Sequence, residues 1–215
     1  MDPSRGTFIV LDGTEGSGKS TQARMLHQRL AASLGEGNVL LVRDPGTTRI
    51  GEQVRALLLN PEHAEMNMRC EMLLYMAARA QMMTETILPA LAHDKVVICD
   101  RFVSSTLAYQ LHGDGLTAGD ITAVANIAIH ARWPDLTILL DMPARASMAR
   151  VNREKDRIEQ RPPEYHEQVR KNYLAQAERD PHRYRLINAA RDVQEVHADV
   201  FAAAEARIHP SRPKR

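Results

Sequence analysis

The chain has 215 residues, of which 44% are hydrophobic and 26% are charged, a composition that suits a single globular domain with a substantial core. Its formal net charge of +1 provides no overall field for nucleic acid or a membrane surface, and 4% aromatic residues are few for stacking single-stranded nucleic acid. Two cysteines do not suggest a disulfide framework or a zinc site, and no apolar run approaches membrane-spanning length, so we expect a cytoplasmic protein that binds neither membrane nor nucleic acid.

Short apolar runs alternate along the chain with segments of helical period. This alternation predicts an α/β fold in which a parallel sheet carries helices on both faces. Ligands of such sheets bind at the carboxyl ends of the strands, where the polar clusters of this chain fall. We expect one domain over residues 1–208 and a disordered tail at 209–215. The expected strands cover residues 7–11, 39–42, 96–99, 136–140 and 183–187. The expected helices cover residues 50–59, 68–91, 102–111, 118–131, 163–179 and 193–208. Two further helices are expected, one that ends near residue 34 and one that begins near residue 143.

The long helix predicted over 68–91 has apolar residues on both sides, so we expect other elements to cover both. Arg79 lies within it and therefore needs a partner, because an unpaired buried charge is costly. The residues that recur at helical spacing, and that would form its core stripe, are Leu73, Ala77, Ala80, Thr84 and Ile87.

The stretch after the first strand, Gly13 to Ser20, fits G-x-x-x-x-G-K-[ST], the phosphate-binding loop. Glycines allow backbone N–H groups to turn inward around an anion, and the N-terminus of the following helix adds a positive field. Lys19 can reach the outer phosphates of a nucleotide, and the Ser20 hydroxyl can bind Mg²⁺. The simpler interpretation is a Gly-rich turn with an incidental lysine. Glu15 is unusual there, since a carboxylate repels phosphates; it either points to solvent or accepts a hydrogen bond from a ligand hydroxyl.

Asp100 follows the four apolar residues of the third strand, in the manner of a Walker B carboxylate. Taken without its neighbours, Asp100 is equally well explained as a cap at the end of a strand. Beside a phosphate loop, however, its carboxylate can hold Mg²⁺ directly or through water. Its neighbour Arg101 can clamp a second phosphate. Arg55 lies three residues after Glu52. An ion pair between these two residues on the protein surface would explain Arg55 as well as a role in binding does.

A charged segment at 150–161 follows the fourth strand and is rich in arginine. Such a run is usually a solvated helix end. Phosphoryl transfer, however, needs cations on the transferring group, and the variable positions of the phosphate loop supply none. We therefore predict a mobile lid that carries arginine to the site and excludes water when it closes.

The helix predicted over 102–111 places polar and aromatic residues on one face. Thr106 and Gln110 can read the edge of a base, and Tyr109 can act as a steric wall. The alternative is a half-buried helix that packs its polar face on a neighbour. The nine histidines show no metal-ligand or triad spacing and are interpreted as surface or packing residues.

Several of these stretches occur together in one known family. They are the phosphate loop with Glu15, Arg43-Asp44-Pro45-Gly46, Tyr75-Met76-Ala77-Ala78-Arg79, Asp100-Arg101-Phe102 with Ser105-Thr106-Leu107-Ala108-Tyr109-Gln110, Pro134-Asp135-Leu136-Thr137 and Asp156-Arg157-Ile158-Glu159-Gln160. From Phe8 to about Ala190 the chain resembles bacterial thymidylate kinase, a P-loop nucleoside monophosphate kinase. The resemblance implies a three-layer P-loop NTPase fold with a five-stranded parallel sheet, a short basic lid at about 150–161, and a homodimer. It also implies transfer of the γ-phosphoryl group of ATP to dTMP with Mg²⁺, giving dTDP for dTTP synthesis.

The resemblance implies a role for each matching position. Glu15 approaches the sugar 3′-hydroxyl of dTMP, Tyr75 stacks on thymine, and Arg79 meets its O4. Tyr109 lies where a ribose 2′-hydroxyl would clash. The implied ATP and metal ligands are Gly13, Thr14, Glu15, Gly16, Ser17, Gly18, Lys19, Ser20, Thr21, Asp100 and Arg150, with Ser20 and Asp100 on the metal. The implied dTMP ligands also include Arg43, Arg55, Arg101, Ser105, Thr106 and Gln110, and the catalytic set is Lys19, Asp100, Arg101 and the lid residues Arg153 and Arg157.

Two departures from the family pattern stand out. The usual Arg-Glu-Pro-Gly-Gly-Thr is Arg43-Asp44-Pro45-Gly46-Thr47-Thr48 here, and the stacking phenylalanine is Tyr75, whose hydroxyl needs a partner. Two rival functions stay open at this point. One is a P-loop kinase for another nucleotide or a deoxynucleoside, and the other is a P-loop switch or ATPase that drives a partner. The dense arginines at the strand ends favour a second phosphate ligand over the latter.

Overall fold

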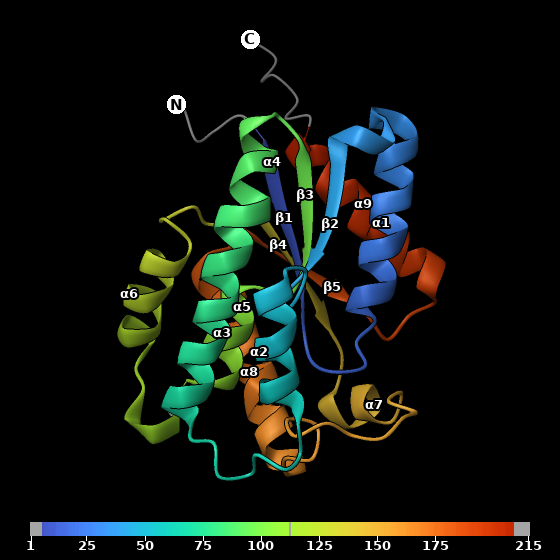
Figure 1. Cartoon of the computed structure of the whole chain (residues 1–215). Coiled ribbons are helices and arrows are strands. Elements are labelled where there is room, and N and C mark those ends of the chain that lie inside the picture. The colour runs from blue at the N-terminus through green and yellow to red at the C-terminus, as the bar shows by residue number, and fades with distance from the viewer. Residues whose placement is uncertain (1–5, 112, 209–215) are drawn as a thin grey trace.

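Five parallel strands in the order β2-β3-β1-β4-β5 form the centre of the fold (Figure 1). The computed structural model describes residues 6–111 and 113–208, so the tail predicted at 209–215 lies outside the described residues. Both neighbours of β1 follow it in the chain, and a crevice forms at the carboxyl ends of the strands where the order reverses. The strands are β1 (Thr7–Asp12), β2 (Val39–Arg43), β3 (Val96–Asp100), β4 (Leu136–Asp141) and β5 (Tyr184–Asn188).

Helices cover both faces of the sheet, which confirms the predicted three layers (Figure 1). Along β1, Phe8 and Val10 belong to a core shared with α3, α4 and α6, whereas Ile9 and Leu11 belong to a second core shared with α1 and α9. Alternate side chains of a strand point to opposite faces, so a strand buried on both sides is apolar throughout. The helices are α1 (Lys19–Leu34), α2 (Arg49–Leu59), α3 (Met68–Met82), α4 (Leu88–Ala92), α5 (Val103–Tyr109), α6 (Ala118–Ala128), α7 (Ala144–Met148), α8 (Pro163–Arg179) and α9 (Val193–Ile208), with short turns η1 (Glu36–Asn38), η2 (Met83–Ile87) and η3 (Gly113–Gly115).

The helix predicted over 68–91 is α3, η2 and α4 in continuous succession. Its predicted core stripe is confirmed at Ile87, which is buried, and at Ala80, which packs against the core, but it is wrong at the other three positions. Leu73 is 52% exposed, and Ala77 and Thr84 are exposed as well, while Met72 and Met76 are buried. Two physical reasons account for this. Helix α3 packs against both α2 and α6, so burial does not follow one stripe. In addition, η2 is a π-helical turn, whose wider winding rotates the residues that follow it.

Helix α6 ends at Ala128, three residues before the predicted end at Ala131. His130 and Ala131 adopt left-handed φ angles of 51° and 54°, which a right-handed helix cannot continue through. In the described part of the chain, no helix is both long enough and apolar enough to cross a membrane.

Candidate active site

The loop between β1 and α1 has the backbone of a phosphate-binding loop. Gly13, Gly16 and Gly18 have positive φ angles of 140°, 73° and 94°. A Cβ on Gly16 would lie 1.9 Å from the carbonyl oxygen of Ser147, and one on Gly13 would lie 2.5 Å from that of Leu140. These two positions therefore require glycine, and the predicted Gly-rich turn between strand and helix is confirmed.

Lys19 begins α1 and turns its side chain back over this loop. Its Nζ donates a hydrogen bond to the carbonyl oxygen of Thr14 at 2.6 Å, and the residue is buried. Burial, followed by the charge of Arg101, lowers the pKa of Lys19 from 10.5 to about 8. A phosphate group at the loop would supply the negative charge that this buried ammonium lacks.

The predicted metal ligands Ser20 and Asp100 lie together at the strand ends. The Ser20 hydroxyl, on α1, donates to Oδ2 of Asp100, at the end of β3, over 2.5 Å. Mg²⁺ takes oxygen ligands and usually keeps one or two protein groups beside phosphate and water, which this pair can provide. No group of three or more His, Cys, Asp or Glu that could hold a metal occurs among the described residues.

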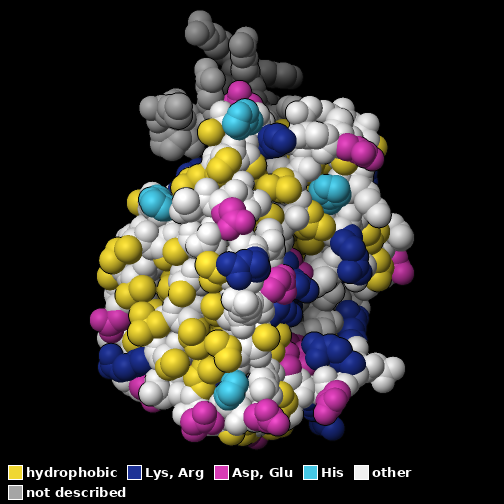
Figure 2. Space-filling model, viewed as in Figure 1, with side chains coloured by type: hydrophobic (Ala, Val, Ile, Leu, Met, Phe, Trp, Pro, Cys, Tyr) yellow, Lys and Arg dark blue, Asp and Glu magenta, His cyan; other side chains and the backbone are white. Residues whose placement is uncertain are grey.

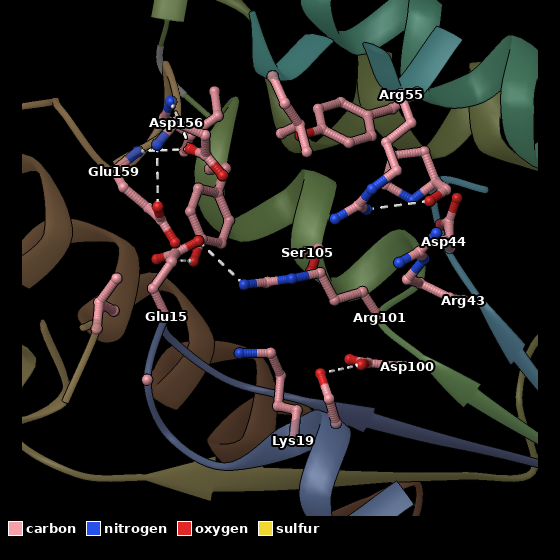
Figure 3. Close-up of a pocket in the computed structure, with 18 of the residues that line it drawn as sticks. Glu15, Lys19, Arg43, Asp44, Arg55, Asp100, Arg101, Ser105, Asp156 and Glu159 are labelled. Carbon is pink, nitrogen blue, oxygen red and sulfur yellow. Dashed lines mark hydrogen bonds and ion pairs between the residues drawn. The ribbon is translucent and has the colours of Figure 1, made fainter. Parts of the chain in front are cut away.

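A cavity of about 650 Å³ opens at the carboxyl ends of the strands, within the range of small-molecule sites (Figure 3). It is bounded by the phosphate loop, by residues of α2, α3 and α5, and by the segment between α7 and α8. Of the predicted site residues, Gly13, Thr14, Ser17 and Arg157 do not line it. Those that do are Glu15, Gly16, Gly18, Lys19, Ser20, Thr21, Arg43, Arg55, Tyr75, Arg79, Asp100, Arg101, Ser105, Thr106, Tyr109, Gln110, Arg150 and Arg153.

Glu15 does not point to solvent; it lies in a buried cluster at the wall of this cavity. Its Oε1 accepts from Nη2 of Arg101 at 3.0 Å, and its Oε2 accepts from the Tyr109 hydroxyl at 2.6 Å. Burial alone would raise the pKa of Glu15, but the charges of Arg101 and Lys19 outweigh it and hold that pKa below its usual value. Arg101 has a positive φ of 73°, a strained backbone that directs its side chain across the phosphate loop.

Arg79 has the partner that its burial demands. It is 1% exposed, and its guanidinium lies 2.6 Å from Oδ2 of Asp44, which is also 1% exposed. Thr106 accepts from the same guanidinium at 3.3 Å. Despite Arg79, burial raises the pKa of Asp44, whose Oδ1 has no hydrogen-bond partner among the described residues. Asp44, which stands where the family usually has glutamate, therefore holds Arg79 through one oxygen only.

The surface ion pair considered for Arg55 and Glu52 does not form. Glu52 instead pairs with Arg43 at 2.9 Å, at the exposed rim of the cavity. Arg55 donates to the carbonyl oxygen of Pro45 at 3.1 Å. Figure 3 shows Arg55, Arg101 and Lys19 entering the same space from three different elements. The cavity thus gathers cations around a phosphate loop.

Comparison with known proteins identifies this arrangement. The family model for thymidylate kinase matches residues 11–200. The chain is 46% identical over 204 residues to a thymidylate kinase of Pelotomaculum thermopropionicum, covering 94% of each protein, and 44% identical to one of Symbiobacterium thermophilum, covering 92% of each. It also resembles the crystal structure of thymidylate kinase from Ehrlichia chaffeensis, with a TM-score of 0.77 and 32% identity over 93% of this chain and 98% of that one. The chain belongs to the thymidylate kinase family. Thymidylate kinases are nucleoside monophosphate kinases, so the predicted family, fold and enzyme class are confirmed.

The arginines predicted for the lid of this thymidylate kinase family member have different surroundings. Arg153 is 60% exposed on its side chain and pairs with Glu159 at 2.6 Å, and Arg150 donates to the carbonyl oxygen of Ala189 at 3.2 Å. Arg157 is buried instead, pairs with Glu71 of α3 and donates to the carbonyl oxygen of Leu58 at 2.9 Å. It therefore joins the segment to α3 rather than facing the cavity.

Sequence reasoning did not single out two buried residues beside the thymidylate kinase site. Glu71 accepts hydrogen bonds from Arg161 at 2.7 Å and from Nε2 of Gln110 at 2.6 Å, so one N–H of the amide expected to read a base is already engaged. His166, on α8, is buried 3.7 Å from Glu15. Both contacts join residues far apart in the chain, and neither position belongs to a local pattern.

Proposed function

We propose that the chain transfers the γ-phosphoryl group of ATP to dTMP, with Mg²⁺, and so forms dTDP for dTTP synthesis. One observation carries the proposal. A single cavity is lined both by a phosphate-binding loop and by a set of further cations, Arg43, Arg55 and Arg101. A hydrolase that activates water needs no second cluster of phosphate ligands, whereas a kinase must hold two phosphorylated molecules in line.

The donor side of the proposed reaction consists of the phosphate loop, Lys19 and Arg150. Backbone N–H groups and the start of α1 face the nucleotide phosphates, and Lys19 neutralises charge on the group in transfer. Ser20 and Asp100 are the residues that would hold Mg²⁺, which would neutralise phosphate charge at this position. Positioning and neutralisation are the contributions that this chemistry requires of a protein.

The acceptor side is proposed to hold dTMP by its base, sugar and phosphate. Arg55 and Arg101, with Arg43 nearby, face the phosphate, while Tyr75 stacks on thymine and Arg79 reaches its 4-oxo group. The ion pair with Asp44 fixes Arg79 at the cavity wall, which supports a fixed reading of one base edge. Tyr109, held by its hydrogen bond to Glu15, supports the steric exclusion of a ribose 2′-hydroxyl. The remaining proposed contacts come from Ser105, Thr106 and Gln110.

The segment at 150–161 is proposed to act as the lid. Arg150 and Arg153 are both exposed and both line the cavity, and Arg153 is the residue that we assign to the transferring phosphoryl group. Arg157 is proposed to anchor the segment on Glu71. Normal turnover by an Arg153→Ala variant would remove that residue from the mechanism.

A coupled assay of ADP release tests this function directly. With ATP and Mg²⁺ we expect rapid ADP release only when dTMP is added, and at least tenfold lower kcat/KM with dCMP, dGMP or the ribose form of TMP, because Arg79 and Tyr109 disfavour them. Full ADP release without any monophosphate would support the ATPase alternative. Equal rates with another monophosphate would support a kinase of different substrate.

We also propose that the protein is a cytoplasmic homodimer. Two free cysteines suit a reducing compartment. Figure 2 shows hydrophobic side chains gathered over α3 and α6, and the exposed apolar residues there and on α2 include Leu57, Leu73 and Ile127. A contiguous apolar face on a water-exposed helix layer favours association. Sedimentation velocity at micromolar concentration should give a mass near twice 24.1 kDa, and a Leu73→Glu variant should sediment as a monomer.

A further inference from the structure

His166 has surroundings that packing alone does not explain. Its side chain is 3% exposed, in the first turns of α8. Within residues 6–111 and 113–208, neither of its ring nitrogens has a hydrogen-bond partner. Its Nδ1 lies 3.7 Å from Oε2 of Glu15, just beyond hydrogen-bond distance. Since buried polar groups are nearly always paired, this imidazole calls for a partner that it can gain in another state of the site.

Glu15 is the group that such an imidazole can reach. Both of its carboxylate oxygens already accept hydrogen bonds, one from Arg101 and one from Tyr109. Glu15 lies close to the phosphate loop and is 11% exposed on its side chain, so water can replace a lost partner only in part. A buried carboxylate that loses a charged donor is strongly destabilised unless another donor takes its place.

Arg101 has two competing uses. In this structure its Nη2 is bound to Glu15 at 3.0 Å, and its Nη1 donates to Ser105 at 3.1 Å. A monophosphate in the cavity carries about two negative charges and competes with the carboxylate for the same guanidinium. A phosphate that takes Nη2 of Arg101 would therefore withdraw a donor from Glu15.

We propose that His166 is a positioning residue for the acceptor nucleotide, and that its imidazole donates to Glu15 when Arg101 turns to the acceptor phosphate. The inference rests on the proposed function, because it requires a phosphorylated acceptor at Arg101. The exchange lets Arg101 bind phosphate without leaving Glu15 unpaired. His166 contacts no substrate in this scheme and acts through Glu15 alone.

Substitution of His166 tests the exchange through a split between KM and kcat. His166→Phe fills the space without a donor, and we expect its KM for dTMP to rise about tenfold, the effect of one lost hydrogen bond to a charge, with kcat changed by less than threefold. His166→Gln keeps an N–H donor and should stay within about twofold of the parent KM. His166→Met replaces the Phe variant if the latter does not fold. Glu167→Gln, at a neighbouring residue of α8 whose side chain is 44% exposed, is the matched control and should leave KM unchanged.

A double-mutant cycle decides whether His166 acts through Glu15. On a Glu15→Gln background, His166→Phe should raise KM no further, because the carboxylate that it serves is gone. Additive effects, or equal KM values for the Phe, Gln and parent proteins, would overturn the inference while leaving the proposed function intact. A parent protein without dTMP-dependent ADP release would overturn both.

Discussion

Replacement of Lys19 by alanine should lower kcat by about 10³-fold, the scale observed when one preorganised donor is removed from a transition state. The ammonium lies over the phosphate loop, where charge accumulates as the phosphoryl group moves. Burial already disfavours the charged form of Lys19, as its pKa of about 8 indicates. The Lys19→Ala substitution should therefore not lower the stability of the folded protein. Coupled ADP-release kinetics and thermal unfolding measure the two effects. Lys171→Ala, an exposed lysine on α8, is the control and should change neither.

The lowered pKa of Lys19 should be detectable as proton uptake when a nucleotide binds. At pH 8 about half of the free molecules carry an uncharged Lys19, and bound phosphates restore the charge, so ADP binding should take up roughly half a proton. Titration calorimetry in buffers of different ionisation enthalpy measures this uptake, which should vanish in Lys19→Ala. A kcat within tenfold of the parent in the variant would contradict the role assigned to Lys19, and binding without proton uptake in the parent protein would contradict its lowered pKa.

The parts of the site that the sequence predicted are those fixed by local chemistry. Gly13 and Gly16 are required by backbone angles and close carbonyl oxygens, so they appear in the sequence as a motif. Asp100 ends a buried strand, and parallel strands bring their carboxyl ends to one edge. The strand, its loop and the following helix thus specify one another over a short stretch of chain.

The contacts that the sequence did not predict are between residues far apart in the chain. Arg157 and Glu71 are separated by 86 positions, and only the fold shows that the arginine binds α3 rather than a phosphate. The core stripe of α3 failed for a related reason, since α3 packs against both α2 and α6, and hydrophobic periodicity within one helix does not show which elements will cover it. His166 carried no motif, and its importance arises only from the position of Glu15.

The buried ion pair of Arg79 and Asp44 should make a large contribution to the free energy of unfolding. Arg79→Met preserves most of the side-chain volume but leaves the Asp44 carboxylate buried without its cation, which should lower the free energy of unfolding by about 3–5 kcal/mol. Urea unfolding measures this loss. Arg183→Met breaks an exposed pair with Asp180 and should cost less than about 1 kcal/mol.

The pH dependence of this loss identifies its cause. Burial already raises the pKa of Asp44, and removal of Arg79 should raise it further. A carboxyl whose folded pKa exceeds its unfolded pKa costs no stability while protonated and destabilises increasingly as pH rises through the folded pKa. Arg79→Met should therefore be destabilised less at pH 5 than at pH 8, and the added substitution Asp44→Asn should recover part of the loss at pH 8. A loss independent of pH, with no recovery in the double variant, would show that Arg79 stabilises the fold by packing and not by pairing with Asp44.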